Sequence, residues 1–373
     1  MNREDIKYWV GFSLISGIGR VRFACLEKYF GNMANAWKAT TAELKQAGLD
    51  KRTINNINSE RPKISLDAEM EKLDHYGVRA MTYLDNDYPT RLKQIYDYPP
   101  VLYIRGSLLP EDEWCLAVVG SRRATIYGKQ VAEEMATDLA QSKITVVSVL
   151  ARGIDAIAHN SALEAGGRTI AIFASGLDIV YPGENSKLAR RIMEQGALIS
   201  EYPLGTKPRA ENFPRRNRIM SGLSLGVIVI EAAESSGALI TANMALEQNR
   251  EVFAIPGSIL SPASSGTNRL IQEGAKLVRN YRDILEELNL TVLAHQIGLE
   301  EITTTSNTES LLLKQLSAEP VHIDEVCRNS DLPMQTVSST LAIMELKGLV
   351  NQVGAMNYVL AREVREKYSV KAD

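Results

Sequence analysis

Between residues 71 and 290 the chain alternates short apolar runs with longer stretches whose apolar positions recur at helical spacing. Several runs are apolar at consecutive positions, which is typical of strands covered by helices on both faces of a parallel sheet. This alternation predicts an α/β fold with an extended, Rossmann-like doubly wound sheet, whose ligands bind beyond the carboxyl ends of the strands. The predicted strands are CLAVVG (115–120), ITVVSV (144–149), TIAIFASG (169–176), ALISEYP (197–203), LGVIVIEA (225–232) and EVFAIPG (251–257).

Residues 1–70 show helical periodicity alone, for example in IKYWVGFSLI and VRFACLEKYFG. They predict a small helical module of helix-hairpin-helix or SAM-like type ahead of the sheet. Within it, ISGIGRVRF places Gly17 and Gly19 directly before a helix, where backbone amides can meet a phosphate. The same pattern fits a plain glycine-containing connection between packed helices, and both interpretations stay open.

The C-terminal part of the sequence separates into a linker and a third domain. Residues 291–309 are rich in Thr, Ser and Asn and show little apolar periodicity, so they predict a linker. Residues 310–373 show three helical stretches and then two short strand-like pieces around Gly354, which is the order of a winged helix. Its target is DNA or a protein. The third helical stretch carries only Lys347 against Glu345, which disfavours DNA because phosphate contacts need basic residues.

Composition favours no class of partner. The 373 residues include 42 basic and 45 acidic side chains, so any anion site must be local. Cys25, Cys115 and Cys327 stand apart, and without a CxxC motif we expect neither disulfides nor a metal site. The N-terminus lacks the pattern of a signal peptide and no apolar run is long enough to span a bilayer. We therefore expect a cytoplasmic protein with no membrane contact.

The segment VVGSRRATIYG (118–128) takes a predicted strand into a tight turn ahead of a helix, where backbone amides favour an anion. A dinucleotide site would need GxGxxG, but only Gly120 is in register, and Arg122 would crowd a pyrophosphate. We expect no cofactor here. Ser121, Arg122, Arg123 and Thr125 are candidates for phosphate binding, and a structural turn with solvated arginines is the alternative.

Two further turns of this type follow other predicted strands. LARGIDAIAH places Arg152 before a helix that contains His159, a residue more typical of an interior position than of a catalyst. EAAESSGALITA opens another helix at Gly237. Because the carboxyl ends of parallel strands meet at one edge, the three turns should converge on one crevice, and a row of phosphates fits such a surface better than a single one.

Residues 205–222, GTKPRAENFPRRNRIMSG, form a local basic cluster with five basic residues and one acidic residue. Arginine for phosphate, Phe213 for stacking and Asn212 for hydrogen bonding together favour a surface for single-stranded nucleic acid. The alternative is a solvated basic helix start in which Phe213 is buried as a hydrophobic staple. The basic residues are Lys207, Arg209, Arg215, Arg216 and Arg218.

Two common hydrolase motifs are missing: the sequence contains no GKS or GKT P-loop and no HExxH. Glu201 and Glu231 stand at predicted strand ends, where a general acid or base could lie, but neither has an evident partner. Structural or capping roles are the favoured interpretation of both. No catalytic residue is therefore assigned.

The motifs taken together resemble the DNA-processing protein A (DprA/Smf) family. The resemblance covers roughly residues 83–285 and includes VVGSRRATIYG, LARGIDAIAHNSAL, SGLDIVYPGENSKL, NFPRRNRIMSGLS and VIVIEAAESSGALITANMALEQNREVFAIPG. One departure is SVLARG, where the family more often has a second small residue near Val149. A rival hypothesis is a nucleotide or nucleoside phosphate hydrolase on a lysine decarboxylase-like Rossmann fold, although PGSILSPASSGTNRL lacks that group's PGGxGTxxE loop.

The resemblance implies a non-enzymatic recombination mediator that binds single-stranded DNA. It would protect incoming strands during natural transformation and help load the RecA recombinase, as a homodimer. Carried over by motif, the first turn would contact phosphate and the basic cluster would stack on bases and hold the backbone. The expected DNA-binding residues are Ser121, Arg122, Arg123, Thr125, Arg152, Arg209, Asn212, Phe213, Arg215, Arg216, Asn217 and Gly237.

Overall fold

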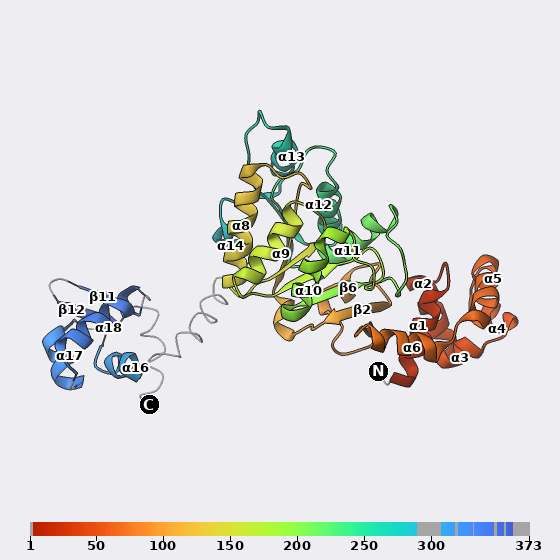
Figure 1. Ribbon diagram of the computed structural model, residues 1–373, viewed down its shortest axis with the longest axis horizontal. Helices are drawn as coiled ribbons and strands as arrows, with labels where there is room; N and C mark the ends of the chain where they lie inside the picture. The colour runs from red at the N-terminus through yellow and green to blue at the C-terminus, as the bar shows by residue number, and fades with distance from the viewer. Residues whose placement is uncertain are drawn as a thin grey trace. The chain divides into compact units, whose positions relative to one another are not determined.

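The chain divides into two units, Met1–Ala294 and His295–Asp373. The structure is a computed structural model (Figure 1) and describes residues 3–288, 307–317, 320–330, 332–346, 349–353 and 356–360. Residues 291–306 of the predicted linker, together with Lys347 and Gly354, lie outside the described residues. The predicted domain boundaries stay predictions.

A central sheet organises the first unit. Its described strands are β1 (Arg79–Thr82), β2 (Val101–Gly106), β3 (Cys115–Val119), β4 (Thr145–Val149), β5 (Thr169–Ile172), β6 (Ala197–Ser200), β7 (Gly226–Val229), β8 (Glu251–Ala254) and β9 (Lys276–Leu277). They lie in the order β1-β2-β6-β5-β4-β3-β7-β8-β9. The strands from β6 to β9 in this order pair in parallel, whereas β1 and β2 add an antiparallel edge. The winding reverses between β3 and β7, the switch point next to which ligands bind in such sheets.

The predicted doubly wound fold is confirmed, and each predicted strand contains one of the observed strands β3 to β8. Strands β1, β2 and β9 were not predicted. β1 and β2 form an antiparallel pair that lies outside the alternation of strand and helix, and β9 is two exposed residues long. The exposed residues of β9 lack the consecutive apolar positions that identify buried parallel strands, whereas β2 has four of them and was missed because no helical stretch alternates with it.

Helices cover both faces of the sheet (Figure 1). One face packs against α8 (Ile126–Gln141), α9 (Ile154–Glu164), α10 (Ser186–Gln195) and α14 (Tyr281–Glu287). The other face packs against α7 (Thr90–Gln94), α11 (Asn212–Leu223), α12 (Gly237–Glu247) and α13 (Ser265–Gln272). Short 3-10 turns lie at Arg61–Lys63, Pro110–Glu113, Gly183–Asn185 and Pro262–Ser264.

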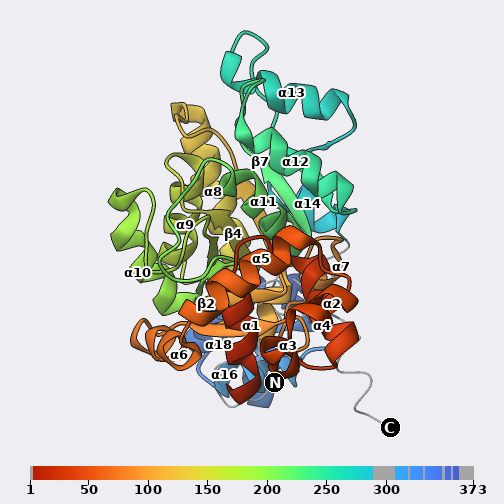
Figure 2. The same ribbon diagram turned by 90° about the vertical axis from the view of Figure 1, so that its right-hand side faces the viewer.

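Six described α-helices precede the sheet: α1 (Arg3–Leu14), α2 (Arg20–Phe30), α3 (Met33–Lys38), α4 (Thr41–Gln46), α5 (Lys51–Glu60) and α6 (Leu66–His75). Of these, α1 and α6 pack against the antiparallel edge of the sheet. Trp9 stacks on Phe23 at 5.2 Å between ring centroids. The Ser13 hydroxyl lies 2.6 Å from the hydroxyl of Tyr103 on β2, and these aromatic rings belong to one hydrophobic cluster with α10. Figure 2 faces these helices; α1 lies beside β1 and β2, and α6 lies beside β1. The shared core therefore fixes the helical module against the sheet.

The second unit is a small winged helix. Its described elements are α16 (Asn307–Leu313), β10 (Val321–His322), α17 (Ile323–Ser330), α18 (Met334–Leu346), β11 (Val350–Gln352) and β12 (Asn357–Leu360). The strands pair antiparallel in the order β10-β12-β11, and Leu312, Val326 and Leu341 are fully buried between the helices and this sheet. The predicted winged helix is confirmed, with β10 as an additional short strand. No described helix is both long and apolar enough to cross a membrane.

Candidate nucleic-acid interface

The three predicted turns converge beyond the carboxyl ends of β3, β4 and β7. They line two adjoining cavities of about 390 Å³ and 340 Å³. The larger one has Gly120, Asp155, Asn217 and Gly237 in its walls, and the smaller one has Arg152, Tyr181 and Glu184. Both are lined by Arg122, Ala151, Phe213 and Arg216, so we treat them as one extended surface, the crevice.

The first turn is closed by a carboxylate of the protein itself. The amide of Thr125 donates to Oε2 of Glu231 at 3.0 Å, and its hydroxyl donates to Oε1 at 2.6 Å. Thr125 also accepts a hydrogen bond from the Gly128 amide and so caps α8. The sequence predicted a phosphate at this helix N-terminus, but in the structure the polar atoms of Thr125 are already bonded to Glu231.

The first and second turns pack backbone against backbone. Gly153 has a φ of +74°, and a Cβ there would lie 2.2 Å from the carbonyl oxygen of Ser121. Ser121 in turn accepts a hydrogen bond from the amide of Ile154, and its hydroxyl accepts one from Arg123. Only glycine fits this position, because a side chain would clash and the left-handed conformation disfavours any other residue. Val149, the position where the sequence departs from the family pattern, ends β4 and is buried.

Two acidic residues lie beside the predicted cations. Asp155 is 4% exposed, and burial raises its pKa to about 7, although the nearby Arg216 and Arg122 charges and a bond from the Gly120 amide favour the ionised form. Glu184 accepts two hydrogen bonds from Arg152, at 2.7 Å and 2.8 Å. The charge of Arg152 is thus compensated, whereas Arg122 and Arg123 are exposed and form no ion pair with any described residue.

Two predicted contact residues are largely buried, because they attach α11 to the sheet. Asn212 donates its side-chain amide to the carbonyl of Ala174, and Arg216 donates from Nη1 to the carbonyl of Ile172 at 2.5 Å. Burial lowers the pKa of Arg216 to about 10, so its guanidinium is charged at neutral pH. Arg216 is only 6% exposed but reaches the wall of both cavities. Arg216 therefore contributes a buried positive charge to the crevice wall, close to the carboxyl of Asp155.

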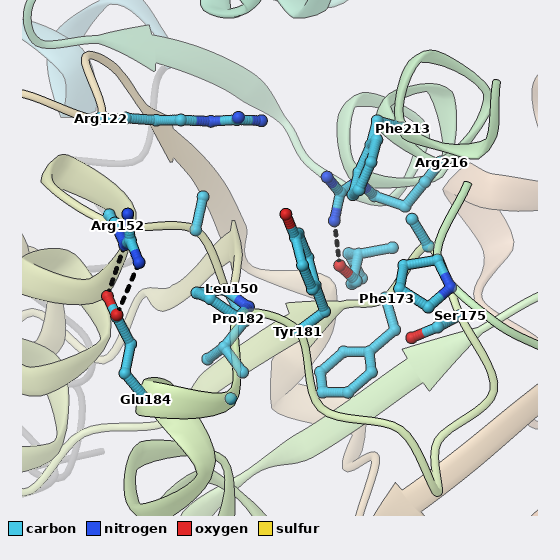
Figure 3. A pocket seen from close by; sticks show the side chains of 15 residues that line it. Arg122, Leu150, Arg152, Phe173, Ser175, Tyr181, Pro182, Glu184, Phe213 and Arg216 are labelled. Atoms are coloured by element: carbon cyan, nitrogen blue, oxygen red, sulfur yellow. Dashed lines mark hydrogen bonds and ion pairs between the residues drawn. The ribbon is translucent and has the colours of Figure 1, made fainter. Parts of the chain in front are cut away.

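Phe213 is half-buried and supplies the aromatic surface predicted from the sequence. Its ring lies 5.9 Å from that of Tyr181, and the Arg216 guanidinium lies 5.9 Å from the ring centroid. Figure 3 shows Arg122 extending across the pocket in the direction of Phe213, with Tyr181 between Phe213 and the loop of Pro182. Tyr181 is 57% exposed and was not assigned a role from the sequence, where an aromatic residue before proline in a loop is a weak signal.

The remaining predicted residues fall into two groups. Asn217 lies in the crevice wall and accepts a hydrogen bond from Nε of Arg216, and Gly237 opens α12 with free space around it. Arg209, Asn212 and Arg215 instead line a separate cavity of about 1030 Å³. The basic cluster is therefore divided between two surfaces.

The two carboxylates considered as general acids or bases have structural partners. Glu231 accepts two hydrogen bonds from Thr125, the cap of α8, and Glu201 is held by Arg218 at 2.7 Å. His159 is fully buried, 2.6 Å from the Thr169 hydroxyl, as expected for an interior histidine. In the part of the chain that the structure describes, no three His, Cys, Asp or Glu side chains form a possible metal site.

These features define a class: a Rossmann-type α/β protein with a cationic and aromatic crevice at its switch point, followed by a winged helix. The family model for DNA recombination-mediator protein A matches residues 79–289, and the DprA winged helix domain model matches residues 300–356. The chain belongs to the DNA recombination-mediator protein A family.

Relatives and solved structures agree with this assignment. Protein Smf of Synechocystis sp. is 34% identical over 96% of this chain and 99% of its own length. The X-ray structure of DNA processing protein A from Streptococcus pneumoniae matches with a TM-score of 0.67 and 37% identity, over 75% of this chain and 97% of that one. DNA processing protein A from Helicobacter pylori, solved in a study of its single-stranded DNA binding mode, matches with a TM-score of 0.52 and 30% identity, over 57% of this chain and 96% of that one.

Proposed function

We propose that the crevice binds single-stranded DNA, and that the protein protects such strands and helps load RecA onto them during recombination and natural transformation. The observation that carries this proposal is the shared wall of the two cavities. There Arg122 and Arg216 supply positive charge, and Phe213 supplies a stacking surface next to Tyr181. Cations that follow a backbone and aromatics that stack on bases are the two components of single-strand recognition.

The size and shape of the surface support a strand over a mononucleotide. The two cavities adjoin, and their walls run from Arg152 on one side to Gly237 on the other. In the first turn, Thr125 and Glu231 are bonded to each other, which favours a structural role for both. The proposal therefore assigns binding and no chemical step to this site.

The test is a titration of the purified full-length protein with a fluorescent oligo-dT strand and with the matching duplex, each at several salt concentrations. We expect tighter binding of the single strand and an affinity that falls with salt, because phosphate contacts release counterions. Equal binding of duplex and single strand would contradict the proposal. Turnover of a nucleoside monophosphate would instead support the hydrolase hypothesis.

RecA loading and a homodimer are further parts of the proposal. They are tested by the rate of RecA filament formation on the same strand with and without the protein, and by sedimentation of the protein alone. Removing residues 306–373 in parallel tests whether the winged helix contributes to DNA binding or to the RecA step. A filament formation rate that the protein leaves unchanged would remove RecA loading from the proposal and leave strand binding in place.

A further inference from the structure

The cavity of about 1030 Å³ lies between the helical module and the α/β domain of the first unit. Its walls come from the turn before α2, from residues 97–101 after α7, and from the basic cluster. We call it the N-terminal groove. The lining residues on which the argument depends are Gly19, Arg20, Tyr98, Lys207, Arg215 and Arg218.

Positive charge in the groove exceeds what its own carboxylates compensate. Asp97 and Glu201 are both held by Arg218, at 2.7 Å each. Lys207 and Arg215 are exposed and form no ion pair with any described residue. Because each carboxylate is already bonded, these two cations are available to an external anion.

The helical module adds a cation, an aromatic surface and an open helix end to the same groove. The Arg20 guanidinium lies 4.6 Å from the ring centroid of Tyr98 and 4.9 Å from that of Tyr96, and its Nε has no hydrogen-bond partner. Gly19 precedes α2 without a side-chain cap, and a Cβ at Gly19 would meet nothing within 4 Å. The first amides of α2 are therefore not covered by a side chain, which favours an anion.

The groove and the crevice meet at the first turn of α11. Phe213 and Arg216 line the crevice, whereas Asn212 and Arg215 line the groove. A chain of phosphates that crosses this turn would meet cations on both sides of it. A single small anion would occupy either the crevice or the groove and would not contact both.

We propose that the N-terminal groove is a second binding site for single-stranded DNA, which receives the strand as it leaves the crevice. This inference rests on the proposed function and assigns the helical module a direct part in it, through Arg20 and the open end of α2. The protein would then hold a longer stretch of DNA than the crevice alone accommodates.

The experiment compares oligo-dT strands of increasing length, from about 4 to about 16 nucleotides, the range of site sizes in single-strand-binding grooves. The test variant is Lys207→Ala with Arg215→Ala. The matched control is Lys51→Ala with Arg52→Ala, which removes the same two charge types from exposed positions on α5, outside the groove lining. Arg20→Ala, checked by thermal unfolding, is a second variant that tests the helical module itself.

We expect the test variant to bind the shortest strands as the control does and to lose the gain in affinity with length. On the longest strand, the slope of log affinity against log salt concentration should be smaller in magnitude by about 1.4, because two phosphate contacts are lost. Arg20→Ala should also reduce that gain.

If test and control variants bind every length equally, the inference is wrong and the proposed function of the crevice is unaffected. If the wild type binds no strand, the proposed function itself fails. Loss of RecA binding with unchanged DNA binding would make the groove a protein surface and overturn the inference.

Discussion

The amide and the hydroxyl of Thr125 both donate to the carboxylate of Glu231, a residue 106 positions further along the chain. This contact joins the turn after β3 to the end of β7, across the switch point of the sheet. The N-terminus of α8 is thereby neutralised by the protein's own carboxylate. We infer that the anion-binding capacity of the crevice depends on its side chains more than on this helix end.

The first prediction concerns the stability that this contact provides. Glu231→Ala should lower the free energy of unfolding by about 3 kcal/mol, because two hydrogen bonds to a charged group are lost. Gly128→Ala should also destabilise the protein, since a Cβ at Gly128 would lie 2.7 Å from Oε2 of Glu231. Urea denaturation of both variants measures these changes.

The double variant is the control for this interpretation. Once Glu231→Ala has removed the carboxylate, Gly128→Ala should be stabilising by about 1 kcal/mol, the helix propensity of alanine over glycine. A Gly128→Ala effect of the same sign and size in both backgrounds would show that the carboxylate is not what excludes a side chain at this position.

The second prediction separates two arginines of the crevice by their partners. Arg122 forms no ion pair with any described residue, whereas Arg152 donates two hydrogen bonds to the carboxylate of Glu184. Arg122→Ala should therefore weaken single-strand binding more than Arg152→Ala does, and should reduce the salt slope by about 0.7. Glu184→Gln should strengthen binding, because it releases Arg152 and removes a negative charge. Oligo-dT titrations at several salt concentrations measure all three, and equal losses at both arginines would contradict the assignment.

The sequence predicted the parallel strands β3 to β8 and the convergence of three turns because both follow from local patterns: consecutive apolar residues, and glycine or serine before a helix. It did not predict that Glu231 closes the first turn or that Glu184 holds Arg152. Those contacts join residues far apart in the chain, and a single carboxylate in a sequence does not indicate its partner. The sequence predicts one surface for the basic cluster. Its division between crevice and groove depends, for the residues on α11, on the face of the helix that each occupies, and Lys207 and Arg209 of the groove precede this helix.

The third prediction concerns stacking. Phe213→Ala should weaken binding of oligo-dT by about 1 to 3 kcal/mol, the cost of one lost base–aromatic contact. Phe213→Trp should retain most of the affinity, because it keeps an aromatic face. Tyr29→Ala, at a 46% exposed aromatic residue on α2 outside the lining of both cavities and the groove, is the control. If Phe213→Ala binds like the control, Phe213 is a packing residue for Tyr181 and not a stacking surface.

The last prediction uses two buried groups with opposite effects on stability against pH. Burial lowers the pKa of His159 from 6.5 to about 4, so below pH 6.5 the unfolded chain binds a proton that the folded one does not, and the free energy of unfolding falls as pH falls. Burial raises the pKa of Asp155 from 3.8 to about 7. Between about pH 7 and 4 the folded protein therefore keeps a proton that the unfolded chain has released, and the free energy of unfolding rises as pH falls. As pH falls from about 6.5 to 4, the free energy of unfolding of His159→Gln should therefore rise relative to that of wild type. As pH falls from about 7 to 4, that of Asp155→Asn should fall relative to that of wild type. Urea denaturation across this pH range measures both differences. Parallel curves for wild type and either single variant would show that the substituted group titrates alike in the folded and unfolded chain.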